Sequence, residues 1–127
     1  MNTFIPTFML LFSISASSCS ITSPPPTITR TLRIDQKESL ILFADSSFDH
    51  ISHLTFVLTG RIDGESIISL SEPDTLFILD TLESGEVNWK YDSDWYSSTC
   101  YFTYNPKLVS EGRLSITAQF FGTTRSY

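Results

Sequence analysis

The feature that most constrains this chain is a series of short runs in which apolar and polar residues alternate. The clearest run follows Gly112, and every second residue in it is apolar: Leu114, Ile116, Ala118 and Phe120. A period of two is that of a β-strand with one buried face. Similar runs recur at intervals of about 8–12 residues, separated by turn residues, which is typical of β-sandwiches. The sequence therefore predicts an all-β fold, a single antiparallel β-sandwich of about seven or eight strands.

The expected strands cover residues 28–34, 39–44, 54–59, 66–70, 75–79, 87–91, 99–104 and 114–120. Two of these runs, 39–44 and 75–79, are apolar almost throughout, as in strands that are covered on both faces. The polar stretch 45–53 is expected to be a loop with room for one helical turn. Gly60 and the pair Asp63-Gly64 are of residue types that favour turns, and Asn105-Pro106 is expected to end a strand.

The segment from Ser84 to Pro106 concentrates the large aromatic residues, since it holds both tryptophans and four of the five tyrosines. Two alternating runs flank Asp92-Ser93-Asp94, and this pattern predicts a β-hairpin. Its first arm places Val87, Trp89 and Tyr91 on one face, and its second arm does the same with Cys100, Phe102 and Tyr104. Such a hairpin buries much apolar surface and is expected at the centre of the domain.

The N-terminal segment has the composition of an export signal. Residues 4–16 form an uncharged, mostly apolar run that is too short to span a bilayer. Three small residues, Ala16-Ser17-Ser18, precede Cys19. This arrangement resembles the signal of small exported lipoproteins of Bacteroides-like bacteria. The resemblance implies that Cys19 is acylated (palmitate) and becomes the new N-terminus. The alternative is an ordinary secretory signal that is cleaved close to Cys19.

A short Pro-rich stretch follows, with three consecutive prolines at positions 24–26. Such a run favours an extended polyproline conformation and acts as a semi-rigid spacer. We therefore predict a signal peptide at residues 1–18, an acylated cysteine and linker at 19–27, and a β-sandwich domain at 28–127. The expected location is the outer membrane, on its periplasmic or surface face, and secretion is the alternative.

The net charge of −6 limits the range of partners. An acidic chain is a poor ligand for nucleic acid, which requires a basic surface. The expected partners are the membrane, through the lipid on Cys19, and an envelope protein or glycan.

No stretch of the sequence predicts a catalytic centre, a cofactor site or a complete set of metal ligands. Cys100 lies among aromatic residues, where a buried thiol behaves as a small hydrophobic group. His50 and His53 would share one face of a helical turn and could ligate zinc, but no third ligand is identifiable. Asp92 and Asp94 could chelate calcium, and their simpler interpretation is a turn in which they bond the local backbone.

The remaining candidate for ligand binding is the group Tyr91, Asp92, Asp94, Trp95 and Tyr96. If the rings of Trp95 and Tyr96 are exposed at the hairpin turn, they form a platform for a sugar or peptide beside two carboxylates. If Trp95 instead closes one end of the sandwich, the group is structural. The expected function is that of a non-enzymatic envelope protein with a binding or structural role, and the alternative is a carbohydrate-binding module centred on Trp95.

Overall fold

The computed structural model describes residues 24–74 and 77–124. Eight strands account for most of this part of the chain, which confirms the predicted all-β fold. They are β1 (Ile28–Leu32), β2 (Glu38–Phe43), β3 (Phe48–Ile62), β4 (Glu65–Ser71), β5 (Phe77–Leu82), β6 (Gly85–Asp94), β7 (Thr99–Lys107) and β8 (Gly112–Thr124). Within the described ranges, no helix is long and apolar enough to cross a membrane.

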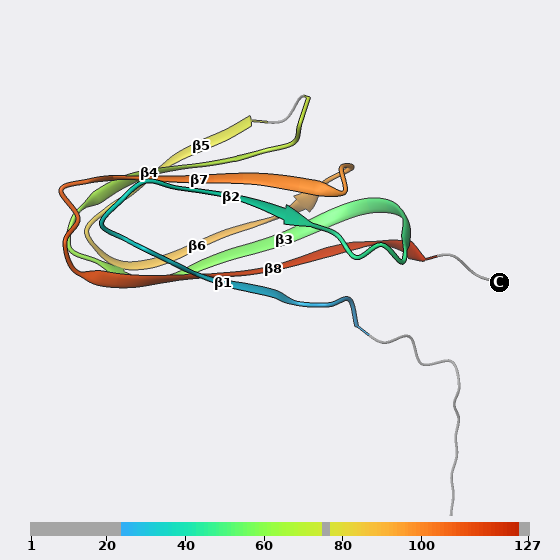
Figure 1. Cartoon of the computed structure of the whole chain (residues 1–127), viewed down its shortest axis with the longest axis horizontal. Helices are drawn as coiled ribbons and strands as arrows, with labels where there is room; N and C mark the ends of the chain where they lie inside the picture. Colours follow the sequence, from blue (N-terminus) through green and yellow to red (C-terminus); the bar gives the residue numbers. More distant parts are fainter. Residues whose placement is uncertain (1–23, 75–76, 125–127) are drawn as a thin grey trace, which may run out of the picture.

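The strands form two four-stranded sheets, and every pairing is antiparallel. Sheet A has the order β1-β8-β3-β6, and sheet B has the order β2-β7-β4-β5. The two sheets pack into a β-sandwich whose strands run along the long axis of the molecule, as Figure 1 shows. β1 begins and β8 ends at the same end of the sandwich (Figure 1). We call this the terminal end.

The predicted hairpin around Asp92-Ser93-Asp94 is wrong. β6 pairs with β3 in sheet A, whereas β7 pairs with β2 and β4 in sheet B. The chain therefore crosses from one sheet to the other between Asp94 and Thr99, and the two aspartates lie inside β6 rather than in a turn. Alternation of apolar residues specifies which face of a strand is buried, but it does not specify which strand lies beside it.

The core lies between the two sheets and contains the residues that the alternation predicted. Sheet A contributes one apolar face of β3 and β8, and sheet B contributes Cys100, Phe102 and Tyr104 from β7. The rings of Phe56 and Phe102 meet across the core, with centroids 5.1 Å apart. The Tyr104 hydroxyl donates a hydrogen bond of 2.7 Å to the Ile34 carbonyl, so this polar group enters the core with a partner.

Three segments that were expected to lie outside strands lie within them. β3 begins at Phe48, inside the stretch predicted to be a loop, and it continues through Gly60 to Ile62. β7 continues through Pro106, which is paired with Ser66 of β4. Pro106 is tolerated there because β2 pairs with β7 only as far as Tyr104, which leaves the other side of β7 without a strand partner at this point.

Gly60 is required by close strand packing and not by a turn. Its φ of +142° is unusual for residues with a side chain, and a Cβ placed there would lie 1.9 Å from the Arg113 carbonyl oxygen of β8. Gly112 has the reciprocal environment, since a Cβ there would lie 2.0 Å from the Arg61 carbonyl oxygen. Two glycines thus permit the close approach of β3 and β8 at the end of β3 and the start of β8.

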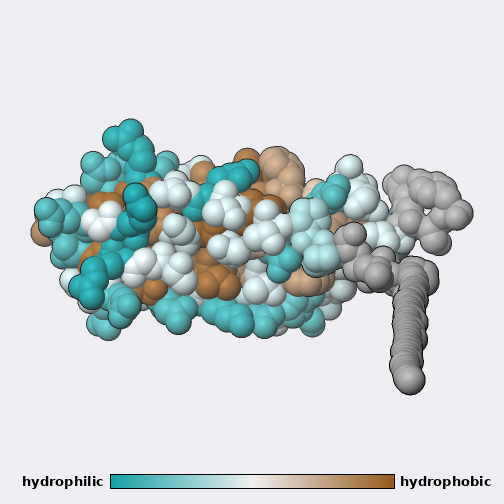
Figure 2. All heavy atoms as spheres, turned by 90° about the horizontal axis from the view of Figure 1, so that it is seen from below, coloured by the Kyte–Doolittle hydropathy of each residue, from teal (hydrophilic) through white to brown (hydrophobic). Residues whose placement is uncertain are grey.

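The two runs predicted to be covered on both faces are the edge strands of sheet B, and each has an open outer face. Ile41 and Phe43 of β2 are 52% and 64% exposed. Phe77 and Leu79 of β5 are 64% and 61% exposed. Apolar residues also reach the surface elsewhere, as Figure 2 shows for one face of the molecule, where they lie among hydrophilic residues.

Candidate functional site

The residues singled out in the sequence lie together at the terminal end of the sandwich. Tyr91, Asp92 and Asp94 belong to the last part of β6, and Trp95 and Tyr96 begin the crossing to β7. β3 runs beside β6 there, with Thr55 opposite Asp92. Successive β6 side chains alternate between the core and the outer face of sheet A. The group therefore divides into an inner pair, Tyr91 and Trp95, and an outer set.

Trp95 is completely buried, so of the two alternatives for this residue the structural one applies. Its indole Nε1 donates a hydrogen bond of 3.1 Å to the Thr99 carbonyl, and its backbone N–H donates one of 3.2 Å to the Ser52 carbonyl. The residue fills the space between the sheets where the chain crosses. Its ring has no open face for a sugar.

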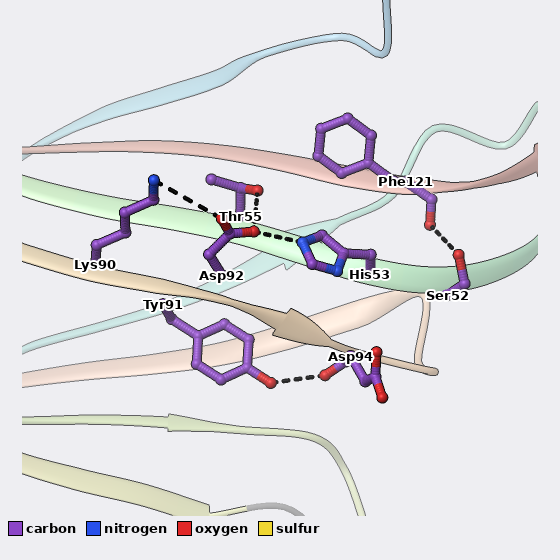
Figure 3. Close-up of polar contacts among 8 residues, drawn as sticks. All are labelled: Ser52, His53, Thr55, Lys90, Tyr91, Asp92, Asp94 and Phe121. Carbon is purple, nitrogen blue, oxygen red and sulfur yellow. Dashed lines mark hydrogen bonds and ion pairs between the residues drawn. The ribbon is translucent and has the colours of Figure 1, made fainter.

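Tyr91 supports Trp95 from β6. The two rings meet edge to face with centroids 5.7 Å apart. The Tyr91 hydroxyl donates a hydrogen bond of 2.6 Å to the Asp94 carbonyl, as Figure 3 shows. Burial raises the pKa of the Tyr91 hydroxyl above its ordinary value, so the group remains a neutral donor at physiological pH. Tyr91 thus closes the end of the core and orders the start of the crossing.

Asp92 lies on the outer face and is the centre of a polar cluster, which we call the Asp92 cluster: His53, Thr55, Lys90 and Asp92 (Figure 3). His53 Nε2 lies 2.5 Å from Asp92 Oδ1, and Thr55 Oγ1 donates to the same oxygen at 3.1 Å. Lys90 Nζ lies 3.7 Å from Asp92 Oδ2. The His53 ring also packs edge to face on Phe121 of β8, with centroids 5.8 Å apart.

These contacts keep Asp92 ionised. The hydrogen bond from His53, followed by that from Thr55, lowers the pKa of the Asp92 carboxyl below its ordinary value. Both carboxylate oxygens are engaged by groups of the protein itself. The cluster therefore joins β3 to β6 across the outer face of sheet A.

Tyr96 is the one aromatic residue of the group that is strongly exposed, with 71% of its surface accessible. Its backbone N–H donates a hydrogen bond of 3.0 Å to Glu72 Oε1, which fixes the crossing against the β4–β5 connection. The negative charge of Asp94 raises the pKa of the Tyr96 hydroxyl. Tyr96 also lines an open hollow of about 630 Å³ together with Phe48, His50 and other residues of the terminal end.

The structure separates the two histidines. The helical turn that would have placed His50 and His53 on one face does not form, because both residues belong to β3. His53 contacts Asp92, whereas His50 Nε2 lies 3.9 Å from Asp49. Among the described residues, no group of three or more His, Cys, Asp or Glu side chains is arranged to hold a metal ion.

Cys100 is fully buried and free, and it lies on the face predicted for it, with Phe102 and Tyr104. Burial raises the pKa of its thiol to about 12. A thiol in this setting is not a nucleophile at neutral pH. Cys19, the predicted acylation site, lies outside the described residues.

Sequence reasoning found the aspartates and tyrosines of this site but not their partners. His53 and Asp92 are 39 positions apart in the sequence, and their contact depends on the register between β3 and β6. The sequence pattern that indicates these partners is the alternation of the apolar residues Leu54 and Phe56 with His53 and Thr55. Had β3 been extended back to His53, this alternation would have placed His53 and Thr55 on the outer face.

The fold and the site define an all-β protein of the β-sandwich class whose candidate site lies at one end of the sandwich. The chain matches no protein-family model, and a search of curated proteins finds no significant match.

Proposed function

We propose that the protein is an exported, lipid-anchored β-sandwich with a binding or structural role in the bacterial cell envelope, and that it catalyses no reaction. The N-terminal segment, with its apolar run and Cys19, motivates the anchor. The observation that carries the proposal is the docking of the linker. Gln119 Nε2 donates a hydrogen bond of 2.9 Å to the Pro25 carbonyl, so the chain that leads to Cys19 leaves the domain from a defined point at the terminal end.

The polar groups of the candidate site support a non-enzymatic role. The carboxylate of Asp92, the hydroxyl of Tyr91 and the indole N–H of Trp95 each bond to another group of the protein. They stabilise strand pairing and the crossing between the sheets. The proposed partners are the membrane, through acyl chains on Cys19, and an envelope protein or glycan. An acidic surface favours these partners over nucleic acid.

The carbohydrate-binding alternative loses its central residue, because a buried Trp95 offers no ring for stacking. Tyr96 alone remains exposed, and a single ring beside the carboxylates Asp94 and Glu72 is a weak platform for a sugar. We therefore do not propose that this site binds carbohydrate.

The test is intact-mass measurement and membrane fractionation of the full chain in a diderm bacterium, beside a Cys19→Ala variant. We expect the wild-type mass to show acylation at Cys19 and the protein to sediment with the outer membrane. The variant should be soluble. Unmodified Cys19 in a cytoplasmic protein would refute the proposal, and soluble exported protein with a cleaved signal would replace the anchor by simple secretion.

A further inference from the structure

The linker that leads towards Cys19 leaves the sandwich at the terminal end. β1 begins there, and Gln119 Nε2 of β8 holds the Pro25 carbonyl at 2.9 Å. We call residues 19–23, which lie between this fixed linker and the predicted acyl chains, the tether. From Cys19 to Pro24 the chain advances five residues, which span at most about 17 Å whatever their conformation.

The tether is short in comparison with the sandwich. β3 has 15 residues and is therefore on the order of 50 Å long. The connections β1–β2, β3–β4, β5–β6 and β7–β8 lie at the opposite end, which we call the distal end (Figure 1). An anchor at Cys19 thus keeps the terminal end close to the lipid surface, whereas it leaves the distal end a full strand length away from the point of attachment.

Apolar side chains surround the point where the linker leaves. Two open hollows of about 540 Å³ and about 240 Å³ share Pro26, Asp45 and Phe48 as lining residues. The linker prolines form one wall of the larger hollow. Except for Asp45, the smaller hollow is lined by apolar residues alone: Pro26, Ile28, Phe43, Phe48 and Phe120. Phe43 is 64% exposed, so an apolar rim lies directly beside the tether.

The charges of the terminal end limit the kind of lipid that suits it. The described residues of the β2–β3, β4–β5 and β6–β7 connections include Asp45, Glu72 and Asp74, and they contain no Lys or Arg. Anionic headgroups attract clusters of basic side chains, so this end gains nothing from an anionic surface. Burial of apolar side chains depends on no such attraction. The terminal end therefore fits a zwitterionic lipid surface.

We propose that the terminal end faces the bilayer, with Phe43 and the linker prolines against the headgroup region of a zwitterionic membrane. This orientation depends on the proposed acylation of Cys19, and it adds which end of the domain meets the membrane. Acylation keeps Pro24 within about 17 Å of the lipid surface. The distal end then points away from the membrane and is the end that an envelope partner reaches first.

Resonance energy transfer from the protein to dye-labelled headgroups tests the orientation. The sample is the full chain, acylated in a diderm bacterium, checked by intact mass and reconstituted into phosphatidylcholine vesicles. Single donor dyes are attached at Ser46→Cys in the β2–β3 connection or at Ser84→Cys in the β5–β6 connection, both exposed positions. Cys100 takes no dye because it is fully buried. Transfer should be at least about twice as efficient from Ser46→Cys, since the two ends are a strand length apart.

Alkylation of single cysteines tests the contact itself. Phe43→Cys and Leu108→Cys place thiols at two exposed apolar positions, one at each end of the sandwich. Each is compared on the vesicles and in a soluble Cys19→Ala background, with a charged maleimide that does not enter the bilayer. Phe43→Cys should react severalfold more slowly on the vesicles. Leu108→Cys is the matched control and should react at the same rate in both samples.

Two results would overturn the orientation while leaving the anchor in place. The first is transfer from Ser84→Cys that equals or exceeds transfer from Ser46→Cys, which would place the sandwich flat or inverted on the bilayer. The second is an alkylation rate of Phe43→Cys that the vesicles leave unchanged. A protein whose mass shows no acylation, and which does not float with the vesicles, would instead refute the proposed function and the orientation together.

Discussion

The two sheets of this sandwich have opposite outer surfaces. The outer face of sheet A carries charged residues on β3, β6 and β8, among them the Asp92 cluster and the opposed pair Arg61 and Glu86. The outer face of sheet B, which we call the neutral face, carries none over the central part of its strands, and its edges expose the large apolar side chains Ile41, Phe43, Phe77 and Leu79. Sheet A uses its outer residues to hold its own strands together. The exposed residues at the edges of sheet B are apolar, and such side chains cannot form polar contacts of this kind.

Two adjacent residues also differ, one being buried and the other exposed, and they give the largest expected effect on stability. Trp95 is buried at the crossing between the sheets, whereas Tyr96 is exposed. Trp95→Ala should lower the free energy of unfolding by about 3–5 kcal/mol, because it leaves a cavity in the core. Tyr96→Ala should change it by less than about 1 kcal/mol. Chemical denaturation of both variants checks this, and equal losses would contradict the buried position of Trp95.

The next largest effect on stability is expected where β3 and β8 approach each other closely in sheet A. Gly60→Ala should lower the free energy of unfolding by more than about 3 kcal/mol, because the new Cβ combines a clash with an unfavourable φ. Gly85→Ala is the matched control, since Gly85 has a φ of +116° but no atom within 4 Å of the added Cβ. Gly85→Ala should lower the free energy of unfolding by only about 1–2 kcal/mol. Urea denaturation separates the two, and equal costs would show that steric contact contributes nothing.

The Asp92 cluster predicts a pH dependence that the neutral face lacks. The folded pKa of Asp92 lies below its unfolded value of about 3.9, so its contribution to stability is complete above that value and is lost as the pH falls through the folded pKa. Asp92→Asn should therefore lower Tm at pH 7 and have a diminishing effect as the pH is lowered towards 2.

Thermal unfolding between pH 7 and pH 2 measures this difference. Asp63→Asn provides a comparison at the other end of the molecule, because a hydrogen bond from the Ser110 hydroxyl also lowers the pKa of Asp63. A Tm difference between wild type and Asp92→Asn that is the same at every pH would contradict the ionic role of Asp92.

The smallest effect on stability is expected on the neutral face. Ile41→Lys should change the free energy of unfolding, measured by urea denaturation, by no more than about 0.5 kcal/mol. The side chain is more than half exposed, so the monomer loses little burial. A large loss would show that Ile41 serves the fold, and the contrast between the two faces would then disappear.

The sequence predicted the strands and their buried faces well. Leu54, Phe56 and Leu58 are fully buried on one side of β3, and Leu114 and Ile116 are buried on one side of β8. The first part of β3 was missed because its pairing with β8 contains register shifts, so the apolar residues Phe48 and Ile51 do not follow a period of two. Gly60 was misassigned because a glycine in a turn and one in a close strand contact have the same local signature.

Long-range relations were not predictable from the same pattern. β6 and β7 are neighbours in sequence but belong to different sheets, and Trp95 is buried because it lies at the crossing between them. The exposed positions of β2 and β5 could not be foreseen either, because an apolar run does not reveal whether its strand is at the edge or the centre of a sheet. The candidate site changed accordingly from an aromatic platform to a polar cluster between β3 and β6.

The strand order also has a consequence for the time course of folding. β4 and β5 are the one pair of consecutive strands that pair with each other in the described part of the chain, and every other pairing joins distant segments. β8, the last of the eight strands along the chain, lies between β1 and β3 in sheet A. Sheet A therefore cannot be completed until the residues of β8 are available.

Such non-local topologies fold slowly, on a scale of about milliseconds to seconds. A chain that emerges from its N-terminus leaves β1 without its strand partner until β8 has been synthesised. Until then β3 also lacks one of its two neighbours, so the apolar faces of β1 and β3 remain incompletely covered.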